Sequence, residues 1–129
     1  MNALLEYIDA WRRHDVEGVL RTLADDCVIT ECYGPVYHGR DRVEQWMRAW
    51  LTAGGSVDSW EVTWHAGTSD FHVAEWRFGS TWQGDSETFE GASLARLNGE
   101  KITYLREYAT TAPRYDWTGA TDEARSGQG

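Results

Sequence analysis

The spacing of apolar residues changes near residue 56, from the period of a helix to the two-residue alternation of a strand. The first part of the chain therefore predicts helices, and the later part predicts a sheet. Helices segregated in this way from an antiparallel sheet are typical of an α+β domain. With 129 residues, the chain is long enough to form one such domain with a core of its own.

Three amphipathic helices are predicted before this change. The first covers about residues 2–13, where the apolar side chains fall on one stripe. Asp15 is suited to cap a second, shorter helix. The third helix follows Gly39 and ends where residues 54–55, both glycine, interrupt the pattern.

A strand is predicted between the second and third helices, at residues 27–33, before a turn at Gly34 and Pro35. Three or four antiparallel strands follow the third helix, and Asn98 and Gly99 carry a strong hairpin signal. These later strands cover about residues 60–65, 73–80, 89–97 and 102–108. Residues 113–129 are polar and small, which predicts a flexible tail with Trp117 as its anchor.

The charge of the chain limits its partners. A net charge of −9 without a basic run disfavours binding to nucleic acid or to an anionic membrane surface. No apolar stretch is long enough to span a bilayer, and the N-terminus lacks a secretion signal, so a cytoplasmic location is expected. Cys27 and Cys32 are interpreted as free thiols in a reducing compartment, because strand alternation points them to opposite faces.

Aromatic residues are abundant, with eight Trp, six Tyr and three Phe. Large rings dominate core burial, so one interpretation is that they only fill the interior. The alternative is an apolar pocket lined by several of them. The sequence alone leaves both open.

Several segments, in their order and spacing, resemble proteins of the nuclear transport factor 2-like superfamily, which includes the ketosteroid isomerases and the SnoaL-like polyketide cyclases. In the first half they are residues 7–17, from Tyr7 to Glu17, residues 23–26 and residues 37–41. In the second half they are residues 74–76, 89–93, 98–102 and 106–108. The resemblance implies a cone-shaped, curved antiparallel sheet around an apolar pocket in a domain of residues 1–112. It also implies a homodimer.

The resemblance to the ketosteroid isomerases also implies two catalytic residues. Glu31 stands where that family has its catalytic aspartate, and Tyr7 stands where it has its catalytic tyrosine. Burial in an apolar cavity raises the pKa of a carboxyl group and makes its ionised form a better base near neutral pH. A tyrosine hydroxyl can donate a hydrogen bond to an enolate oxygen. Ketosteroid isomerase itself is the standard example of this arrangement, so the chemistry is borrowed from it.

The sequence departs from that family at its second acid, which maps onto Ser93. A serine can donate a hydrogen bond but is not a strong acid, so Glu107 is considered as the second carboxyl group, or as an ion-pair partner of Arg106 or Arg77. The presence of two carboxyl groups, Glu31 and Glu107, without the family's second acid favours a cofactor-independent isomerase, cyclase or dehydratase acting on an apolar carbonyl compound. The substrate-binding residues expected beside the catalytic pair are Ile29, Tyr33, Trp46, Trp76, Phe78, Ser93, Leu105 and Glu107.

Two other functions remain open at this stage. The same fold can serve as a non-catalytic ligand-binding or dimerisation module. An epoxide hydrolase would need two acids and an arginine around a water molecule, for which Glu31, Glu107 and Arg77 are the candidates. No cofactor is expected, and the four histidines lack the spacing of metal ligands.

Overall fold

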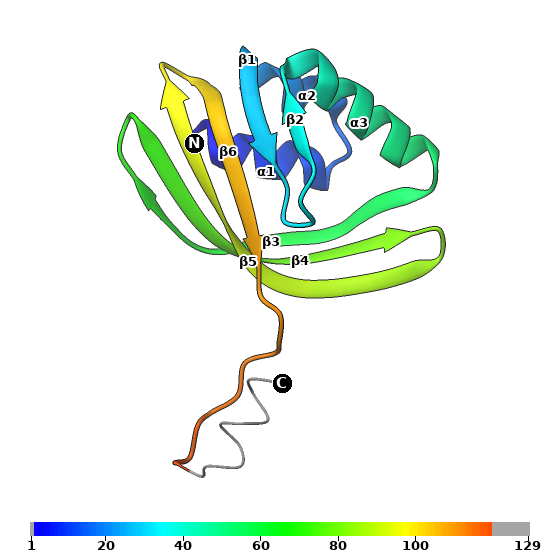
Figure 1. The fold of residues 1–129 in the computed structure, drawn as a ribbon, viewed down its shortest axis with the longest axis vertical. Coiled ribbons are helices and arrows are strands. Elements are labelled where there is room, and N and C mark those ends of the chain that lie inside the picture. Colours follow the sequence, from blue (N-terminus) through cyan, green and yellow to red (C-terminus); the bar gives the residue numbers. More distant parts are fainter. Residues whose placement is uncertain (1, 120–129) are drawn as a thin grey trace.

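The computed structural model describes residues 2–119 and confirms the α+β class. Its nine elements are α1 (Ala3–Arg12), α2 (Val16–Arg21), β1 (Leu23–Thr30), β2 (Val36–His38), α3 (Arg40–Thr52), β3 (Gly55–Gly67), β4 (Phe71–Trp82), β5 (Asp85–Asn98) and β6 (Lys101–Ala109). The strands form a single sheet in the order β2-β1-β6-β5-β4-β3. Figure 1 shows this sheet curved around α1, with α3 beside β1 and β2.

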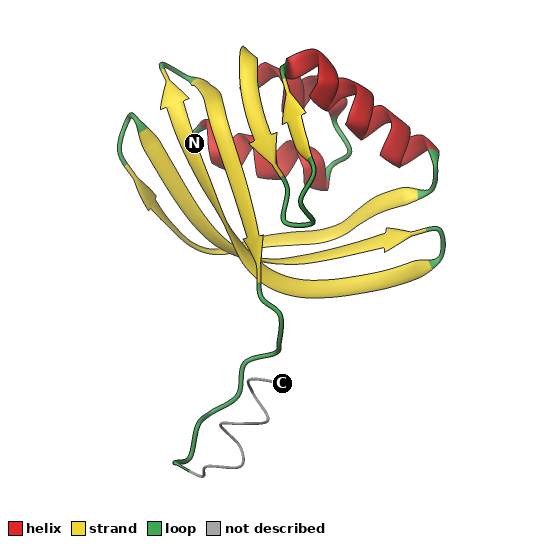
Figure 2. Ribbon diagram, viewed as in Figure 1, coloured by secondary structure: helices red, strands yellow, loops and turns green. Residues whose placement is uncertain are grey.

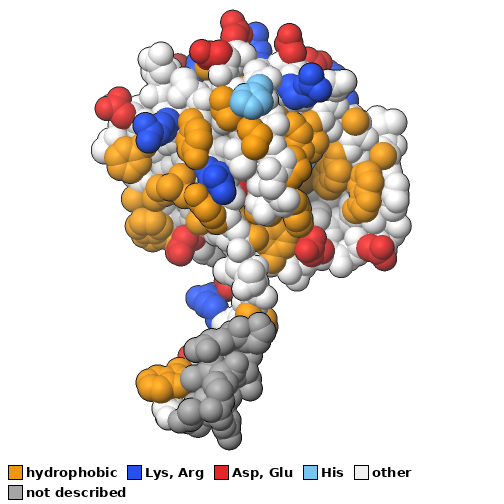
Figure 3. All heavy atoms as spheres, viewed as in Figure 1, with side chains coloured by type: hydrophobic (Ala, Val, Ile, Leu, Met, Phe, Trp, Pro, Cys, Tyr) orange, Lys and Arg blue, Asp and Glu red, His pale blue; other side chains and the backbone are white. Residues whose placement is uncertain are grey.

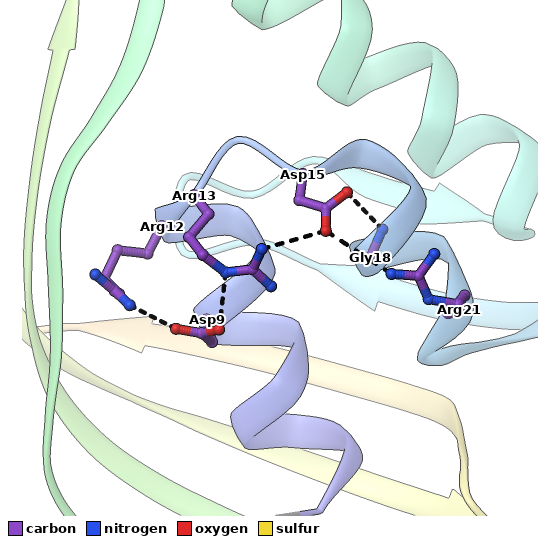
Figure 4. A network of polar contacts seen from close by, with 6 residues as sticks. All are labelled: Asp9, Arg12, Arg13, Asp15, Gly18 and Arg21. Carbon is purple, nitrogen blue, oxygen red and sulfur yellow. Dashed lines mark hydrogen bonds and ion pairs between the residues drawn. The ribbon is translucent and has the colours of Figure 1, made fainter.

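The first two helices, α1 and α2, begin where the sequence provides side-chain caps. The side chain of Asn2 accepts a hydrogen bond from the backbone N–H of Leu5, and Asp15 accepts one from Gly18 at the start of α2. Asp15 also pairs with Arg13 and Arg21, and this small network joins the end of α1 to α2 (Figure 4). Such caps satisfy N–H groups that a helix leaves unpaired at its first turn.

Three features of the sheet were not predicted from the sequence. Strand β1 begins at Leu23, four residues earlier than expected, and a register shift between Leu23 and Val28 accommodates the exposed Asp25 and Asp26. Strand β2 is only three residues long and pairs antiparallel with β1. Strand β1 also pairs in parallel with β6, so the N-terminal hairpin extends the sheet formed by the C-terminal half (Figure 2).

The core lies between α1 and the concave face of the sheet. Leu4 and Ile8 of α1 are buried together with Ile29 of β1 and Leu105 of β6, which are register partners. Strand β5 carries Gly91 opposite Trp76, and a side chain at position 91 would collide with the Trp76 ring and with the backbone of β6. The absence of a side chain there lets the Trp76 ring pack closely against the backbone of β5.

Residues beyond β6 leave the sheet without regular structure as far as the described chain extends, at residue 119. Arg114 donates two hydrogen bonds to the carboxylate of Glu90 on β5, at 3.0 and 2.9 Å. Trp117, the expected anchor, is 66% exposed, so the contact to the sheet is made by Arg114 instead. The part of the predicted flexible tail at residues 120–129 lies outside the described residues. None of the described helices is long and apolar enough to cross a membrane.

Candidate functional site

A cavity of about 330 Å³ lies between the helices and the concave face of the sheet. Its walls are mainly aromatic, because the inner faces of β3, β4 and β5 meet the apolar sides of α1 and α3 there. Six of the eight tryptophans of the chain line it: Trp11, Trp46, Trp50, Trp60, Trp76 and Trp82. Phe78 and Phe89, register partners on β4 and β5, complete this wall with ring centroids 5.4 Å apart.

Glu31 lies at the end of β1, where the chain turns into β2. Its backbone N–H donates to the carbonyl of Pro35, and its own carbonyl accepts from Gly34, so the turn holds this residue in place. The hydroxyl of Tyr37 donates a hydrogen bond to Glu31 Oε1 at 2.7 Å. Partial burial raises the pKa of Glu31, and this hydrogen bond acts in the opposite direction. The ring of Tyr37 is stacked on that of Trp46 in α3, with ring centroids 4.0 Å apart. This stacking holds the Tyr37 hydroxyl in position to donate.

Glu107 lies on β6 and also lines the cavity. It is 9% exposed, and no group of the described chain donates a hydrogen bond to its carboxyl group or forms an ion pair with it. Burial, with a further contribution from the negative charge of Glu31, raises its pKa from 4.5 to about 8. Of the two carboxyl groups, Glu107 therefore has the stronger tendency to hold a proton.

Tyr7 of α1 lines the same cavity and is 1% exposed. Burial, followed by the charge of Glu107 and that of Glu31, raises its pKa well above the ordinary value of a phenol. The hydroxyl therefore stays protonated and can act as a hydrogen-bond donor. Tyr7 and the two carboxyl groups thus form one electrostatic cluster contributed by α1, the end of β1 and β6.

The rim of the cavity is marked by side chains that are partly exposed. The hydroxyl of Tyr33 donates to Glu87 Oε2 at 2.6 Å, and this contact joins the β1–β2 turn to β5. Trp82, which is 41% exposed, lies parallel to Trp50 with ring centroids 6.4 Å apart. The Trp50 ring occupies the space that a side chain at Gly55 would take.

Of the ten residues assigned from the sequence, seven line the cavity: Tyr7, Glu31, Tyr33, Trp46, Trp76, Phe78 and Glu107. The other three, Ile29, Ser93 and Leu105, are fully buried and lie outside its lining. Ser93 accepts a hydrogen bond from the indole N–H of Trp76 at 2.9 Å, so it orients a wall residue.

Sequence reasoning missed other residues in or beside the cavity. Tyr37 lies outside the lining but donates to the lining residue Glu31, and this contact depends on the short β1–β2 hairpin. Glu87 lies on the same face of β5 as Phe89, two residues away, and this alternation was a usable signal. Trp11, Trp50, Trp60 and Trp82 stood out in the composition, but their convergence on one cavity is a property of the tertiary fold.

Other polar clusters do not extend this site. Arg77 pairs with Glu61 and Glu90 on the outer face of the sheet, away from Glu31 and Glu107, so the acid–acid–arginine cluster considered above is not formed. The described residues contain no group of three or more side chains arranged to hold a metal ion. His65 and His72 contact each other at 3.0 Å, outside the cavity.

The family of this domain is shown by its match to a known sequence profile. The profile of the SnoaL-like domain family matches residues 4–105. The chain belongs to the SnoaL-like domain family, within the nuclear transport factor 2-like superfamily. The match spans all three helices and almost the whole sheet, including Tyr7 and Glu31, and it ends two residues before Glu107. No curated protein matches the sequence significantly.

Solved structures of SnoaL-like and related proteins share the fold at low identity. A LEH-like epoxide hydrolase of Mycobacterium tuberculosis has a TM-score of 0.75 at 16% identity, over 84% of this chain and 80% of its own. A protein of ketosteroid isomerase-like fold from Catenulispora acidiphila, solved in complex with trimethylamine, has a TM-score of 0.74 at 20% identity, covering 84% and 85%. A candidate polyketide cyclase from Xanthomonas campestris has a TM-score of 0.70 at 16% identity, covering 84% and 87%.

Proposed function

We propose that this SnoaL-like protein is a cofactor-independent acid–base enzyme, an isomerase, cyclase or dehydratase, acting on a small apolar carbonyl compound. The observation that carries the proposal is the pair formed by Glu31 and Glu107 in one aromatic cavity. Two carboxyl groups whose surroundings separate their pKa values provide a base and an acid at the same pH. In the proposal Glu31, whose carboxylate accepts the hydrogen bond of Tyr37, is the base, and Glu107, whose pKa burial raises to about 8, is the acid.

In the proposed reaction, Glu31 removes a proton from the carbon next to the substrate carbonyl. The electron pair of that C–H bond forms a carbon–carbon double bond. The π electron pair of the carbonyl group moves to its oxygen, which gives an enolate. Tyr7 and the protonated Glu107 donate hydrogen bonds to the developing oxyanion, between walls that are mainly aromatic. Return of the proton from Glu31 to another atom of the substrate completes an isomerisation. In a dehydration, Glu31 instead gives this proton to a β-hydroxyl group, which leaves as water while the enolate collapses to the unsaturated carbonyl compound.

The non-catalytic alternative is a ligand-binding module with the same cavity. The unpaired, buried Glu107 favours the enzyme, because a group that only supports the fold is normally hydrogen-bonded when buried. An epoxide hydrolase is disfavoured, because no arginine lines the cavity of the described chain. One neighbour was solved with trimethylamine, so small amines belong in the same ligand screen.

Exchange of carbon-bound protons tests the proposal without knowledge of the product. The protein is incubated with a panel of apolar ketones in D₂O, and the loss of α-proton signals is followed by NMR. Glu31→Gln is expected to abolish exchange while leaving ketone affinity nearly unchanged. Glu100→Gln, in the exposed turn between β5 and β6, is the matched control and is expected to exchange like the wild type. Binding without exchange in the wild type would favour the ligand-binding module.

We also propose that a second copy of the chain covers the outer face of the sheet. Trp64, Leu94 and Tyr108 on this face are 55%, 42% and 50% exposed. Hydrophobic side chains with basic ones among them can be seen on the surface in Figure 3. Exposed apolar patches of this kind mark interfaces. Light scattering is expected to give a dimer for the wild type and a monomer for Trp64→Glu; a monomeric wild type at high concentration would contradict the proposal.

A further inference from the structure

The cavity combines aromatic walls with an uncompensated negative charge. Three carboxyl side chains line it, those of Glu31, Glu87 and Glu107. In the described chain, the lining contains no Lys, Arg or His. The nearby basic residue Arg77 faces the opposite side of the sheet, where its partners are Glu61 and Glu90. The charge inside is therefore not balanced by the protein itself.

The hydrogen bonds of these acids do not remove that charge. Glu31 accepts from Tyr37, and Glu87 accepts from Tyr33, but both donors are neutral phenols. Glu107 is more than nine-tenths buried and has no hydrogen-bond partner in the described chain, although it lines the cavity. Because Glu107 lines the cavity, a ligand bound there can supply the hydrogen-bond partner that its carboxyl group lacks.

The walls suit a positively charged ligand as well as an apolar one. The face of an aromatic ring is electrically negative and attracts a cation, most strongly for tryptophan. Trp11 and Trp46 lie 4.9 Å apart at a tilt of 51°, and Trp60 meets Trp76 edge to face at 5.5 Å. Rings inclined to one another can surround a rounded ammonium group from several sides, as in the aromatic cages that bind quaternary amines.

We propose that the substrate of this cavity carries, beside its carbonyl part, a cationic amine or quaternary ammonium group, held by the indole rings and by the carboxylates of Glu31 and Glu87. This inference rests on the proposed function, since it names the substrate class of the same site. The neutral carbonyl part of such a substrate reaches Glu31 and Glu107. The positive charge of its ammonium group offsets the negative charge of the carboxylates in the cavity. Carboxylates, phosphates and sulfates are excluded by the same charge.

A pair of probes of nearly equal shape separates charge from apolar contact. Choline and 3,3-dimethylbutan-1-ol differ in that a quaternary nitrogen replaces a quaternary carbon. Their affinities are measured at pH 7.5 by quenching of tryptophan fluorescence and by calorimetry. Choline is expected to bind at least tenfold more tightly than the alcohol. Glu31→Gln is expected to weaken choline at least fivefold and to change the affinity for the alcohol by less than twofold.

The control variant Glu100→Gln removes one exposed negative charge outside the cavity and is expected to leave both affinities unchanged. Equal affinity for the two probes, no binding of choline, or a choline affinity that Glu31→Gln leaves unchanged would each overturn the proposal. Proton exchange in a neutral ketone tests the acid–base function whichever of these binding results is obtained. A failure of the substrate class is therefore distinguishable from a failure of the acid–base function.

Discussion

Tyr37 donates a hydrogen bond to Glu31 at 2.7 Å, and this single contact distinguishes the two acids of the cavity. Glu31 is stabilised in its ionised form by a donor from β2, whereas Glu107 has no donor in the described chain and is more deeply buried. Hydrogen bonding to a carboxylate lowers its pKa, and desolvation raises it. The deeper burial of Glu107 and the hydrogen bond that the short β1–β2 hairpin supplies to Glu31 together favour Glu31 as the base.

Replacing Tyr37 by Phe tests this assignment. The loss of the hydroxyl removes the group that lowers the pKa of Glu31, so that pKa is expected to rise. The stacking on Trp46 is kept, and the fold should be unaffected. In a profile of proton exchange against pH, the acidic limb is expected to move to higher pH by about one unit. A profile that falls in height without moving would contradict the assignment.

The dependence of stability on pH gives a second test. Because the pKa of Glu107 is raised to about 8 in the folded protein, the folded state holds a proton that the unfolded state loses near pH 4.5. Stability must therefore fall as the pH rises from about 4.5 to about 8. At about 1.4 kcal/mol per pKa unit, the loss from this group is at most about 5 kcal/mol.

Urea denaturation at several pH values measures this loss. Glu107→Gln cannot ionise, so its free energy of unfolding is expected to change much less over the same range and to exceed that of the wild type at pH 8.5. Glu100→Gln should keep the slope of the wild type. Parallel curves for the wild type and Glu107→Gln would show that Glu107 ionises normally.

The rim of the cavity depends on Gly55. A Cβ atom at this position would collide with the ring of Trp50, which lies parallel to Trp82. Gly55→Ala is therefore expected to displace Trp50 and to weaken ligand binding about tenfold, with a cost in stability of about 1–3 kcal/mol. Ser56→Ala, one residue further along β3, is the control. Unchanged ligand affinity in Gly55→Ala would show that Trp50 is not part of the binding site.

The helices and the β5–β6 hairpin could be predicted from the sequence because each is marked by capping or turn residues next to it in the chain. Asp15 caps α2, α3 follows Gly39, and the hairpin at Asn98 and Gly99 joins β5 to β6. Strand β2 could not be predicted, since its three residues are too few for a period to appear. The parallel pairing of β1 with β6 brings together segments that are far apart in the chain.

The candidate site could likewise be predicted only in part from the sequence. Glu31 and Tyr7 stand out through the family resemblance, and both line the cavity. The isolation of Glu107 follows from strand alternation, which turns the neighbouring Arg106 to the other face of β6. Its raised pKa depends on how completely the helices cover the sheet, and no sequence pattern reports that quantity. Ser93 matched the position of a family acid, yet in this fold it holds the indole of Trp76.

The protonation of Glu107 is the central property of the proposed site, and a titration of the glutamate side chains by carbon-detected NMR measures it. With resonances assigned through Glu107→Gln and Glu31→Gln, the wild type is expected to show Glu107 titrating near pH 8, consistent with its burial. Removing the charge in Glu31→Gln should lower the pKa of Glu107. A Glu107 resonance that titrates near pH 4.5, and that Glu31→Gln does not move, would contradict the acid–base pair.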